Sequence, residues 1–208
     1  MLKRAFPWLY EHDPEPAEEG AVVEVGEKVV LREKRRSDID DDYGWRVDEE
    51  LSRLDATRPI TMSFEAYRTY AREEMQYATS TSKRLAIDTH DGVHIGNCMY
   101  YDINRRRGVA ELGIMIGDRR YWGAGYGTDA VRTLLSHIFT TTDLDSVYLH
   151  TLKWNDRARQ SFAKAGFREM RTVFRNGYDF VRMEIRRDEW EAARSADDGP
   201  DRNGSHRS

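Results

Sequence analysis

The spacing of apolar and polar residues along the chain predicts seven strands. Short apolar runs, several of which alternate with polar positions, have strand length, and residues that favour turns separate them. The predicted strands cover residues 27–32, 85–87, 95–101, 109–117, 146–152, 167–173 and 178–185. Asp91-Gly92 and Asn176-Gly177 are turn pairs typical of antiparallel hairpins, so we expect the second and third strands to pair, and likewise the last two.

Apolar residues three or four positions apart predict four helices. The first two begin at Ser37 and Ser63, the third spans 126–139, and the fourth runs from Asn155 to about Ala165. Ser37 and Asn155 can each accept a hydrogen bond from a free N–H of the first turn, so we expect them to be caps. The inward-facing positions are Phe64, Tyr67, Ala71, Met75 and then Tyr77 in the second helix, and Ala130, Val131, Leu134, Leu135 and Ile138 in the third. The predicted order is β-α-α-β-β-β-α-β-α-β-β, without an internal repeat.

Length and composition indicate one globular domain. The chain has 208 residues, of which 39% are hydrophobic and 34% are charged, enough for a sizeable core beneath a well-hydrated surface. We expect the domain to cover residues 27–190. Residues 1–26 are expected to form an extension, whose apolar start (Phe6, Trp8, Leu9 and Tyr10) could pack against the body or against a second copy in a homodimer. Residues 191–208 are expected to form a polar, disordered tail.

The counts of particular residue types and the net charge also disfavour several classes of function. Cys98 is the only cysteine, so we expect it in the core and expect neither an internal disulfide nor a cysteine-based metal cluster. The six histidines form no helical i,i+4 pair, and no metal site is predicted. A net charge of −4 argues against nucleic-acid binding. No apolar run resembles a signal peptide or a membrane span, so we expect a cytoplasmic protein without a membrane partner.

The stretch with the most specific chemistry follows the strand at 109–117, where Gly123, Gly125 and Gly127 alternate just before a predicted helix. Glycine lets the backbone approach a ligand closely, and the first turn of a helix offers unpaired N–H groups and the positive end of its dipole. We therefore expect an anion here. A Walker loop is excluded because no lysine follows Gly127, and a dinucleotide fingerprint would need a glycine where Thr128 stands. A tight structural connection and a nucleotide-dependent oxidoreductase stay as weaker alternatives.

The loop resembles the coenzyme A loop of the GNAT superfamily of N-acetyltransferases, in which Gln or Arg is followed by two residues, Gly, one residue, and Gly or Ala. The corresponding residues here are Trp122, Gly123, Ala124, Gly125, Tyr126 and Gly127. A second stretch, from Asn155 and Ala158 to Gly166-Phe167, resembles the Asn-x-x-Ala helix of the same superfamily, which ends in Gly-Phe. Trp122 stands where the pattern has Gln or Arg. In this replacement the loop resembles the subgroup that contains ribosomal-protein-alanine and spermidine acetyltransferases.

The resemblance covers about residues 27–186 and implies an α/β (α+β) GNAT fold. In this fold a mixed, mostly antiparallel sheet flanked by helices splays apart to hold the pantetheine arm of acetyl-CoA, and no metal is implied. The backbone of Met115, Ile116 and Gly117 would pair with the pantetheine amides, and Asn155 would bind the same arm. The loop and the following turn would hold the pyrophosphate; these residues are Trp122, Gly123, Ala124, Gly125, Tyr126, Gly127 and Thr128.

An amine that attacks a thioester must first lose a proton, because an amine with a pKa near ~10 is almost fully charged at neutral pH. Glu111, on the strand that leads to the loop, and His150, on the opposing strand, are the candidate bases, directly or through a water. The alternative roles are an exposed strand carboxylate and a hydrogen-bonded sheet histidine. The position of the family's usual general acid, a tyrosine, holds Phe162. Conceivable substitutes are Tyr126, Tyr148, Ser161 and Tyr178.

We therefore predict an N-acetyltransferase that moves the acetyl group of acetyl-CoA directly to a primary amine, either a protein amino terminus or a small cationic amine. Acids in and after the first predicted helix could attract such a cation, although helix-dipole stabilisation and solvation explain them as well. They are Asp38, Asp40, Asp41, Asp42, Asp48, Glu49 and Glu50. Trp45, Trp154 and Phe174 could belong to the core or to the acceptor wall. The alternative function is a non-catalytic module that binds or senses acyl-CoA, which Phe162 would favour.

Overall fold

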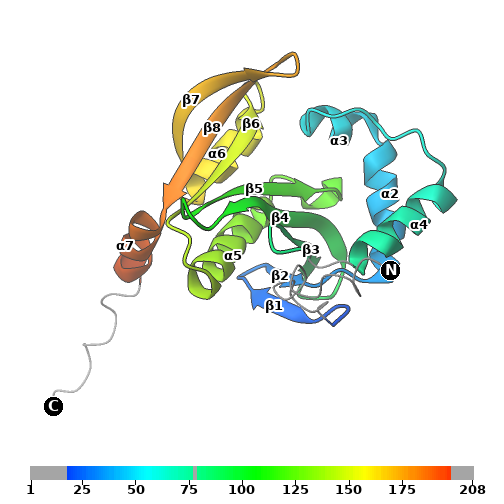
Figure 1. Ribbon diagram of the computed structural model, residues 1–208, viewed down its shortest axis with the longest axis horizontal. Helices are drawn as coiled ribbons and strands as arrows, with labels where there is room; N and C mark the ends of the chain where they lie inside the picture. Colours follow the sequence, from blue (N-terminus) through cyan, green and yellow to red (C-terminus); the bar gives the residue numbers. More distant parts are fainter. Residues whose placement is uncertain (1–17, 77–78, 198–208) are drawn as a thin grey trace, which may run out of the picture.

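The computed structural model describes residues 18–76 and 79–197, which form one eight-stranded sheet with helices on both sides (Figure 1). The strands are β1 (Val22–Val25), β2 (Val29–Arg32), β3 (Lys83–Thr89), β4 (His94–Asn104), β5 (Val109–Ile116), β6 (Ser146–Leu152), β7 (Arg168–Arg175) and β8 (Tyr178–Arg186). Their order across the sheet is β1-β2-β3-β4-β5-β6-β8-β7, and all neighbours are antiparallel except β5 and β6. This is the mixed, mostly antiparallel sheet that the sequence predicts.

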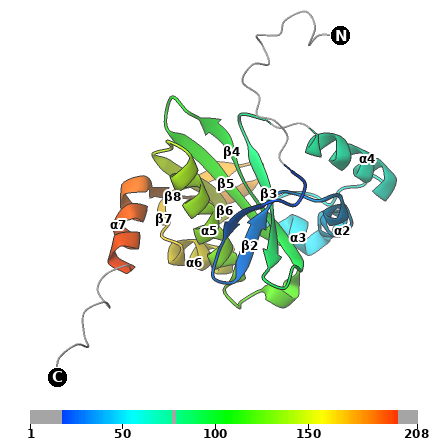
Figure 2. The same cartoon turned by 90° about the horizontal axis from the view of Figure 1, so that it is seen from below.

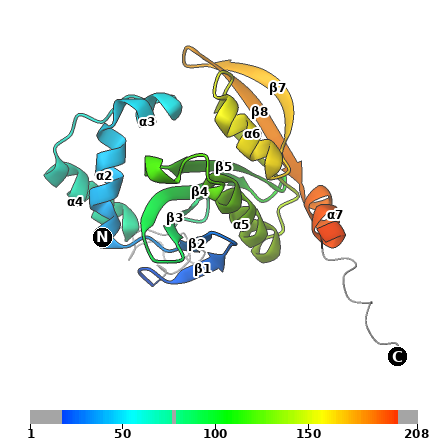
Figure 3. The same ribbon diagram turned by 180° about the vertical axis from the view of Figure 1, so that it is seen from behind.

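The described residues contain six α-helices and two short 3-10 helices. They are η2 (Arg36–Asp38), α2 (Ile39–Val47), α3 (Glu49–Leu54), α4 (Phe64–Met75), η3 (Arg119–Tyr121), α5 (Tyr126–Thr141), α6 (Asp156–Lys164) and α7 (Arg187–Asp197). α5 and α6 lie side by side on one face of the sheet (Figure 3), and α2, α3 and α4 gather on the other side (Figure 2). The five predicted inward-facing residues of α5 are fully buried, and Cys98 lies in the same core, as expected.

Both predicted hairpins are confirmed. β3 and β4 pair around Asp91-Gly92, and β7 and β8 pair around Asn176-Gly177. Asn176 and Gly177 have φ angles of +52° and +84°, as the two-residue turn that matches the twist of paired strands requires. Ser63, where the second helix is expected to begin, caps α4, because its hydroxyl accepts the N–H of Ala66 at 3.3 Å. Local turn and cap chemistry therefore determines these boundaries.

The two edge strands of the sheet each contain an irregularity. β1 shifts register against β2 between Val22 and Glu24, and β7 shifts register against β8 between Glu169 and Arg171. β1 has only four residues. β7 is exposed along nearly its whole length. Neither edge is thus a long, regular strand.

β5 and β6 pair over a short stretch and then diverge. Their paired residues are Val109 with Ser146, Ala110 with Val147, and Glu111 with Tyr148. Beyond this point β5 stays paired with β4, and β6 stays paired with β8 as far as Leu152, which pairs with Phe180. Each strand is therefore paired on its outer side only beyond Glu111 and Tyr148, which confirms the predicted splay.

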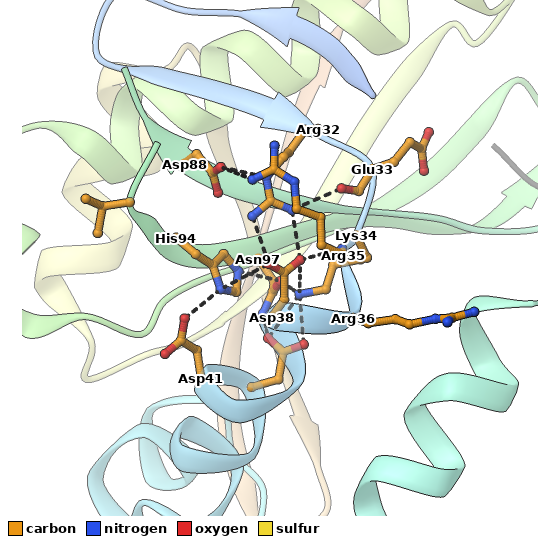
Figure 4. Close-up of polar contacts among 12 residues, drawn as sticks. Arg32, Glu33, Lys34, Arg35, Arg36, Asp38, Asp41, Asp88, His94 and Asn97 are labelled. Carbon is orange, nitrogen blue, oxygen red and sulfur yellow. Dashed lines mark hydrogen bonds and ion pairs between the residues drawn. The ribbon is translucent and has the colours of Figure 1, made fainter. Parts of the chain in front are cut away.

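A buried ion cluster fixes the start of α2 to the sheet (Figure 4). The side chain of Arg32 is 2% exposed. Its guanidinium donates to both carboxylate oxygens of Asp38 at 2.8 Å and to Asp88 of β3 at 2.6 Å. Oδ1 of Asp88 is buried and has no hydrogen-bond partner among the described residues. One guanidinium thus connects β2, β3 and the helical turn before α2, with two carboxylates around it.

The N-terminal part differs from the expectation in three respects. The first predicted strand is shorter, and β1 precedes it within the range 1–26 that we left outside the core. Ser37 is not a cap, because it lies inside η2, where Asp38 instead accepts the N–H of Arg35 at 2.7 Å. The first predicted helix is two helices, since Asp48 interrupts it and caps α3 through the N–H of Leu51. The apolar start of the chain and Tyr77 lie outside the described residues.

The C-terminal part is helical further than expected. α7 continues to Asp197, although residues 191–208 were assigned to a disordered tail. Arg187 explains the position of this helix, since it donates to the carbonyl oxygens of Phe139, Leu144 and Thr142 at the end of α5. The ring of Trp190 packs on Phe139, with 5.3 Å between centroids.

Replacing Asp38 by Asn should destabilise the fold and change its response to acid. Burial alone would raise the pKa of Asp38, but hydrogen bonds from Arg32 and from the N–H of Arg35 outweigh it and lower this pKa from 3.8 to about 2. A carboxylate whose folded-state pKa is depressed stabilises the fold above its unfolded pKa, and this contribution is lost as the pH falls from about 4 to about 2.

We expect Asp38→Asn to lose about 3 kcal/mol of unfolding free energy at pH 7, because Arg32 would keep an incompletely paired buried charge. The difference from the wild type should shrink below about pH 4 in urea titrations at a series of pH values. Asp40→Asn is the matched control, because Asp40 is an exposed acid in the first turn of α2. Equal losses in the two variants would contradict the role of the cluster.

Candidate active site

A cavity of about 880 Å³ opens from the gap between β5 and β6. Its walls are the glycine loop, the first turns of α5 and α6, the end of α3, and the tip of the β7–β8 hairpin. Figure 1 shows the hairpin tip and α3 on either side of the gap. The cavity therefore brings together the predicted anion loop, the candidate bases, α3 and the last hairpin.

The glycine loop has the backbone geometry expected of an anion cradle. Gly123 and Gly125 have φ angles of +75° and +89°, which favour glycine. Gly125 directly precedes the 16-residue helix α5, and no side chain in the described part of the chain caps this helix, so first-turn N–H groups are left for an anion. An added Cβ on Gly127 would meet Ile116 at 3.6 Å, so the loop packs against the end of β5.

Most of the predicted loop residues reach the cavity. Trp122, Gly123, Gly125, Gly127 and Thr128 line it, whereas Ala124 and Tyr126 do not. The ring of Tyr126 instead packs edge-on against Tyr121, with 4.9 Å between centroids.

Trp122 fastens the loop to the sheet. Its indole Nε1 donates to the carbonyl oxygen of Ile116 at 2.7 Å. The guanidinium of Arg157, from α6, lies over the indole face, 3.7 Å from the ring centroid. The residue that replaces the family's Gln or Arg therefore positions both the loop and a cation that lines the cavity.

The alternation of β5 determines which peptide groups face the gap. The N–H of Gly117 donates to the carbonyl oxygen of Ile95 on β4 at 2.9 Å. Because the peptide groups of successive strand residues point to opposite sides, those of Gly117 and Met115 point towards β4, and those of Ile116 and Ile114 point towards the gap. Met115, Ile116 and Ile114 all line the cavity.

Gly117 lies under an aromatic side chain. An added Cβ would lie 2.1 Å from the indole of Trp45, so this position has no room for a side chain. Trp45 also packs on His94, with 4.8 Å between ring centroids. Trp154 and Phe174 are 49% and 73% exposed. None of the three aromatic residues lines the cavity.

Asn155 caps α6 at the edge of the cavity. Its side-chain oxygen accepts the N–H of Ala158 at 3.2 Å, as predicted. Asn155 also lines the cavity, and its amide NH₂ carries two further donors. A cap and a ligand contact by the same side chain are geometrically compatible.

Glu111 and His150 are in direct contact. Nδ1 of His150 lies 2.8 Å from Oε1 of Glu111, with the two side chains 13% and 7% exposed. An ionised carboxylate only accepts hydrogen bonds, so the contact assigns the proton to Nδ1 and leaves Nε2 as an acceptor. Both residues line the cavity. Glu111 is thus a buried carboxylate, not the exposed strand carboxylate considered as its alternative.

Two phenols complete the surroundings of Glu111. Tyr101 of β4 and Tyr148 of β6 are its direct cross-strand partners, so the three side chains share one face of the sheet. Burial, with the charge of Glu111 next, raises the pKa of Tyr101, and the same two causes raise the pKa of Tyr148. Both phenols therefore keep their protons at neutral pH, as donors beside the carboxylate.

The expected position of the general acid holds an apolar ring. Phe162 is 9% exposed, packs edge-on against Phe167, and lines the cavity. Among the four conceivable substitutes, Ser161 alone lines the cavity. Its hydroxyl is 2.8 Å from that of Thr128, at the start of α5.

The acids predicted around the first helix do not line the cavity. Several are engaged in ion pairs: Asp38 with Arg32, Asp42 with Lys34, and Asp48 and Glu50 with Arg119. These pairs connect α2 and α3 to the sheet and to the segment after β5, which favours a structural role. α3 instead contributes the apolar side chains of Leu51 and Leu54 to the cavity wall.

Two residues that the sequence analysis did not single out lie beside the glycine loop. Lys28, in the β1–β2 turn, lines the cavity near Gly125. Asp129, in the first turn of α5, is 7% exposed and accepts backbone hydrogen bonds from the same turn. The sequence shows only that Asp129 is an acid in the first turn of a predicted helix. This does not indicate that its hydrogen-bond donors lie about a hundred residues earlier in the chain.

No group of three or more His, Cys, Asp or Glu side chains in 18–76 and 79–197 could hold a metal ion. No helix in the same ranges combines the length and apolar character needed to cross a membrane.

Comparisons with known proteins agree with this geometry. The model of the acetyltransferase (GNAT) domain matches residues 28–168. Human alpha/beta-tubulin-N-acetyltransferase 9 is 27% identical over 161 residues, which cover 71% of this chain and 76% of that protein. An uncharacterized N-acetyltransferase, p20 of Bacillus licheniformis, is 36% identical over 53 residues, 26% of this chain and 29% of that protein.

Solved structures share the fold. The spermidine N-acetyltransferase from Vibrio cholerae, in complex with CoA and spermine, superposes with a TM-score of 0.69 at 22% identity over 78% of this chain and 98% of that chain. The aminoglycoside acetyltransferase AAC(6')-Ib, in complex with coenzyme A, gives a TM-score of 0.67 at 21% identity over 80% and 99%.

The capping role of Asn155 predicts a difference between two substitutions. Asn155→Ala should lower the free energy of unfolding by about 1 kcal/mol because the N–H of Ala158 loses its acceptor, whereas Asn155→Asp keeps an acceptor and should change stability little. Urea unfolding of both variants measures the difference. Equal stability of the alanine and aspartate variants would contradict the cap.

Proposed function

The chain belongs to the GNAT acetyltransferase family, whose members are acyltransferases that use acetyl-CoA, and on that premise we propose that it acetylates a primary amine by direct transfer. The acceptor we propose is a protein amino terminus or a small cationic amine. The observation that carries the proposal is the contact between His150 and Glu111 at the wall of a cavity that opens from the sheet gap.

The cavity fits the donor substrate along its length. The gap-facing peptide groups of Ile114 and Ile116 are suited to the pantetheine amides, and Asn155 has free amide donors beside them. The loop at Gly123 to Gly127 and the uncapped start of α5 are suited to the pyrophosphate. Acetyl-CoA supplies the thioester, and the protein supplies its orientation.

His150 is suited to be the base. Glu111 holds the Nδ1 proton, so Nε2 can accept the proton of an incoming ammonium group, directly or through a water. The adjacent carboxylate stabilises the imidazolium that results. Glu111 is thereby a positioning residue, and Tyr101 and Tyr148 lie beside it on the same face of the sheet.

Loss of the general acid at Phe162 does not prevent the reaction. As the amine nitrogen bonds to the carbonyl carbon, the C–S bond breaks and the sulfur leaves as a thiolate. A thiol with a pKa near ~8.5 is a tolerable leaving group without a proton donor. We therefore expect a slower enzyme, not an inactive one.

Both acceptor classes fit the remaining walls. Leu51 and Leu54 offer an apolar surface for the stem of an amine, and Glu111 attracts its positive charge. The names of the related proteins include a protein and a small cationic amine: one is a tubulin N-acetyltransferase, and another was solved in complex with spermine. The proposal also includes a catalytic domain at residues 27–190, to which β1 is added at the N-terminal side. It further includes a cytoplasmic location and formation of a homodimer.

The proposed function predicts thiol release from acetyl-CoA with at least one of three acceptor panels: polyamines, aminoglycosides and amino-terminal peptides. Calorimetry should show CoA binding to the protein without an acceptor. Binding of CoA without turnover on any panel would favour the non-catalytic module. Failure to bind CoA would contradict the donor assignment.

The proposed base predicts the effect of two conservative variants. His150→Gln and Glu111→Gln should each lower kcat about 100-fold or more, because the attacking amine would stay protonated, while the Kd for CoA should stay within about twofold. The double variant should be no slower than His150→Gln if the two side chains act as a unit. Glu73→Gln, an exposed acid on α4, is the control. Full activity in both single variants would sink the assignment.

A further inference from the structure

We propose that Lys28 binds the pyrophosphate of the coenzyme, and that buried Asp129 positions the β1–β2 turn from which Lys28 projects. This inference rests on the proposed acetyl-CoA site. It concerns a residue outside both motifs on which the family resemblance was based.

Asp129 holds the turn through three backbone hydrogen bonds. Its Oδ2 accepts the N–H groups of Lys28 at 2.8 Å and Val29 at 3.1 Å, and its Oδ1 accepts the N–H of Glu27 at 3.3 Å. The turn packs closely, since an added Cβ on Gly26 would lie 2.2 Å from the hydroxyl of Thr133 and 2.7 Å from Oδ2 of Asp129. The position of the turn is therefore fixed relative to α5.

A carboxylate at this position would otherwise oppose the function of the loop. Asp129 lies in the first turn of α5, where a helix stabilises negative charge, and it borders the cavity. A free carboxylate there would repel a phosphate. The three N–H donors occupy its oxygens, and the turn that provides them also brings a lysine to the same place.

Lys28 reaches the glycine loop. Its Cε lies 3.5 Å from the point where a Cβ on Gly125 would be, and its Nζ lies 5.7 Å from the ring centroid of Tyr126. The side chain lines the cavity and makes no ion pair within residues 18–76 and 79–197. The Lys28 side chain therefore lies against the loop that precedes α5, within reach of the place where the proposed pyrophosphate would meet the first-turn N–H groups.

The test is calorimetric binding of CoA to Lys28→Met and Lys28→Arg. The methionine keeps the apolar stem but removes the charge, and we expect the Kd to rise about tenfold, as for one lost hydrogen bond to a charged group. Lys28→Arg should stay within about twofold of the wild type. Arg72→Met, which removes a positive charge from the exposed side of α4, is the matched control and should leave the Kd unchanged.

Dephospho-CoA separates the two phosphate positions of the coenzyme. If Lys28 contacts the pyrophosphate, Lys28→Met should weaken CoA and dephospho-CoA by the same factor. A loss confined to CoA would assign Lys28 to the 3′-phosphate and overturn the inference, as would an unchanged Kd for both ligands. If wild-type protein does not bind CoA, the proposed function fails and this inference fails with it.

The direction in which Asp129→Asn changes the affinity for CoA tests the positioning role. If Asp129 were only a nearby negative charge, its removal would tighten CoA binding. If it positions Lys28, Asp129→Asn should weaken CoA binding in the wild-type background and should not weaken it further in Lys28→Met. Tighter binding in the wild-type background would overturn the positioning role.

Discussion

The gap between β5 and β6 is the constraint on which the remaining structure depends. A peptide group in the interior of a protein costs free energy when it has no hydrogen-bond partner. Ile114 and Ile116 turn their peptide groups towards a space that no strand fills, and the indole of Trp122 satisfies one carbonyl there. β5 and β6 are each paired along their outer side, but beyond Glu111 and Tyr148 they are not paired with each other. The cavity, the loop and the pair of candidate catalytic side chains all follow from this interruption.

Features that depend on a few neighbouring residues could be predicted from the sequence, and features that depend on distant partners could not. Asn176-Gly177 and Asn155 determine a turn and a cap through their own chemistry. The contact between Glu111 and His150 depends on strand register, which the spacing of residues along the chain does not provide. Arg32 alternates with buried Val29 and Leu31 and would be expected to reach solvent, but the turn that carries Asp38 covers it.

The acidic residues around α2 and α3 mainly have a structural role. Acids that a sequence reading could assign to substrate attraction instead pair with Arg32, Lys34 and Arg119, and they connect the α2–α3 segment to the sheet. This segment carries the apolar wall of the cavity, so its attachment determines the shape of the proposed acceptor site. Asp129 also has a structural role, at the other end of the cavity, because its hydrogen bonds join the β1–β2 hairpin to α5.

The irregular register at both borders of the sheet bears on how copies of this protein can meet. An edge strand that is long, flat and regular offers its free peptide groups to another chain, whereas a bulge twists the edge away and a short strand offers few groups. β1 has four residues and a register shift, and β7 combines its own shift with Arg168, Arg171 and Arg175. Continuation of the sheet from one molecule into the next is therefore disfavoured at either border. A homodimer of this chain would thus use surfaces other than the sheet borders, and the same irregularities oppose growth of the sheet into fibrous aggregates.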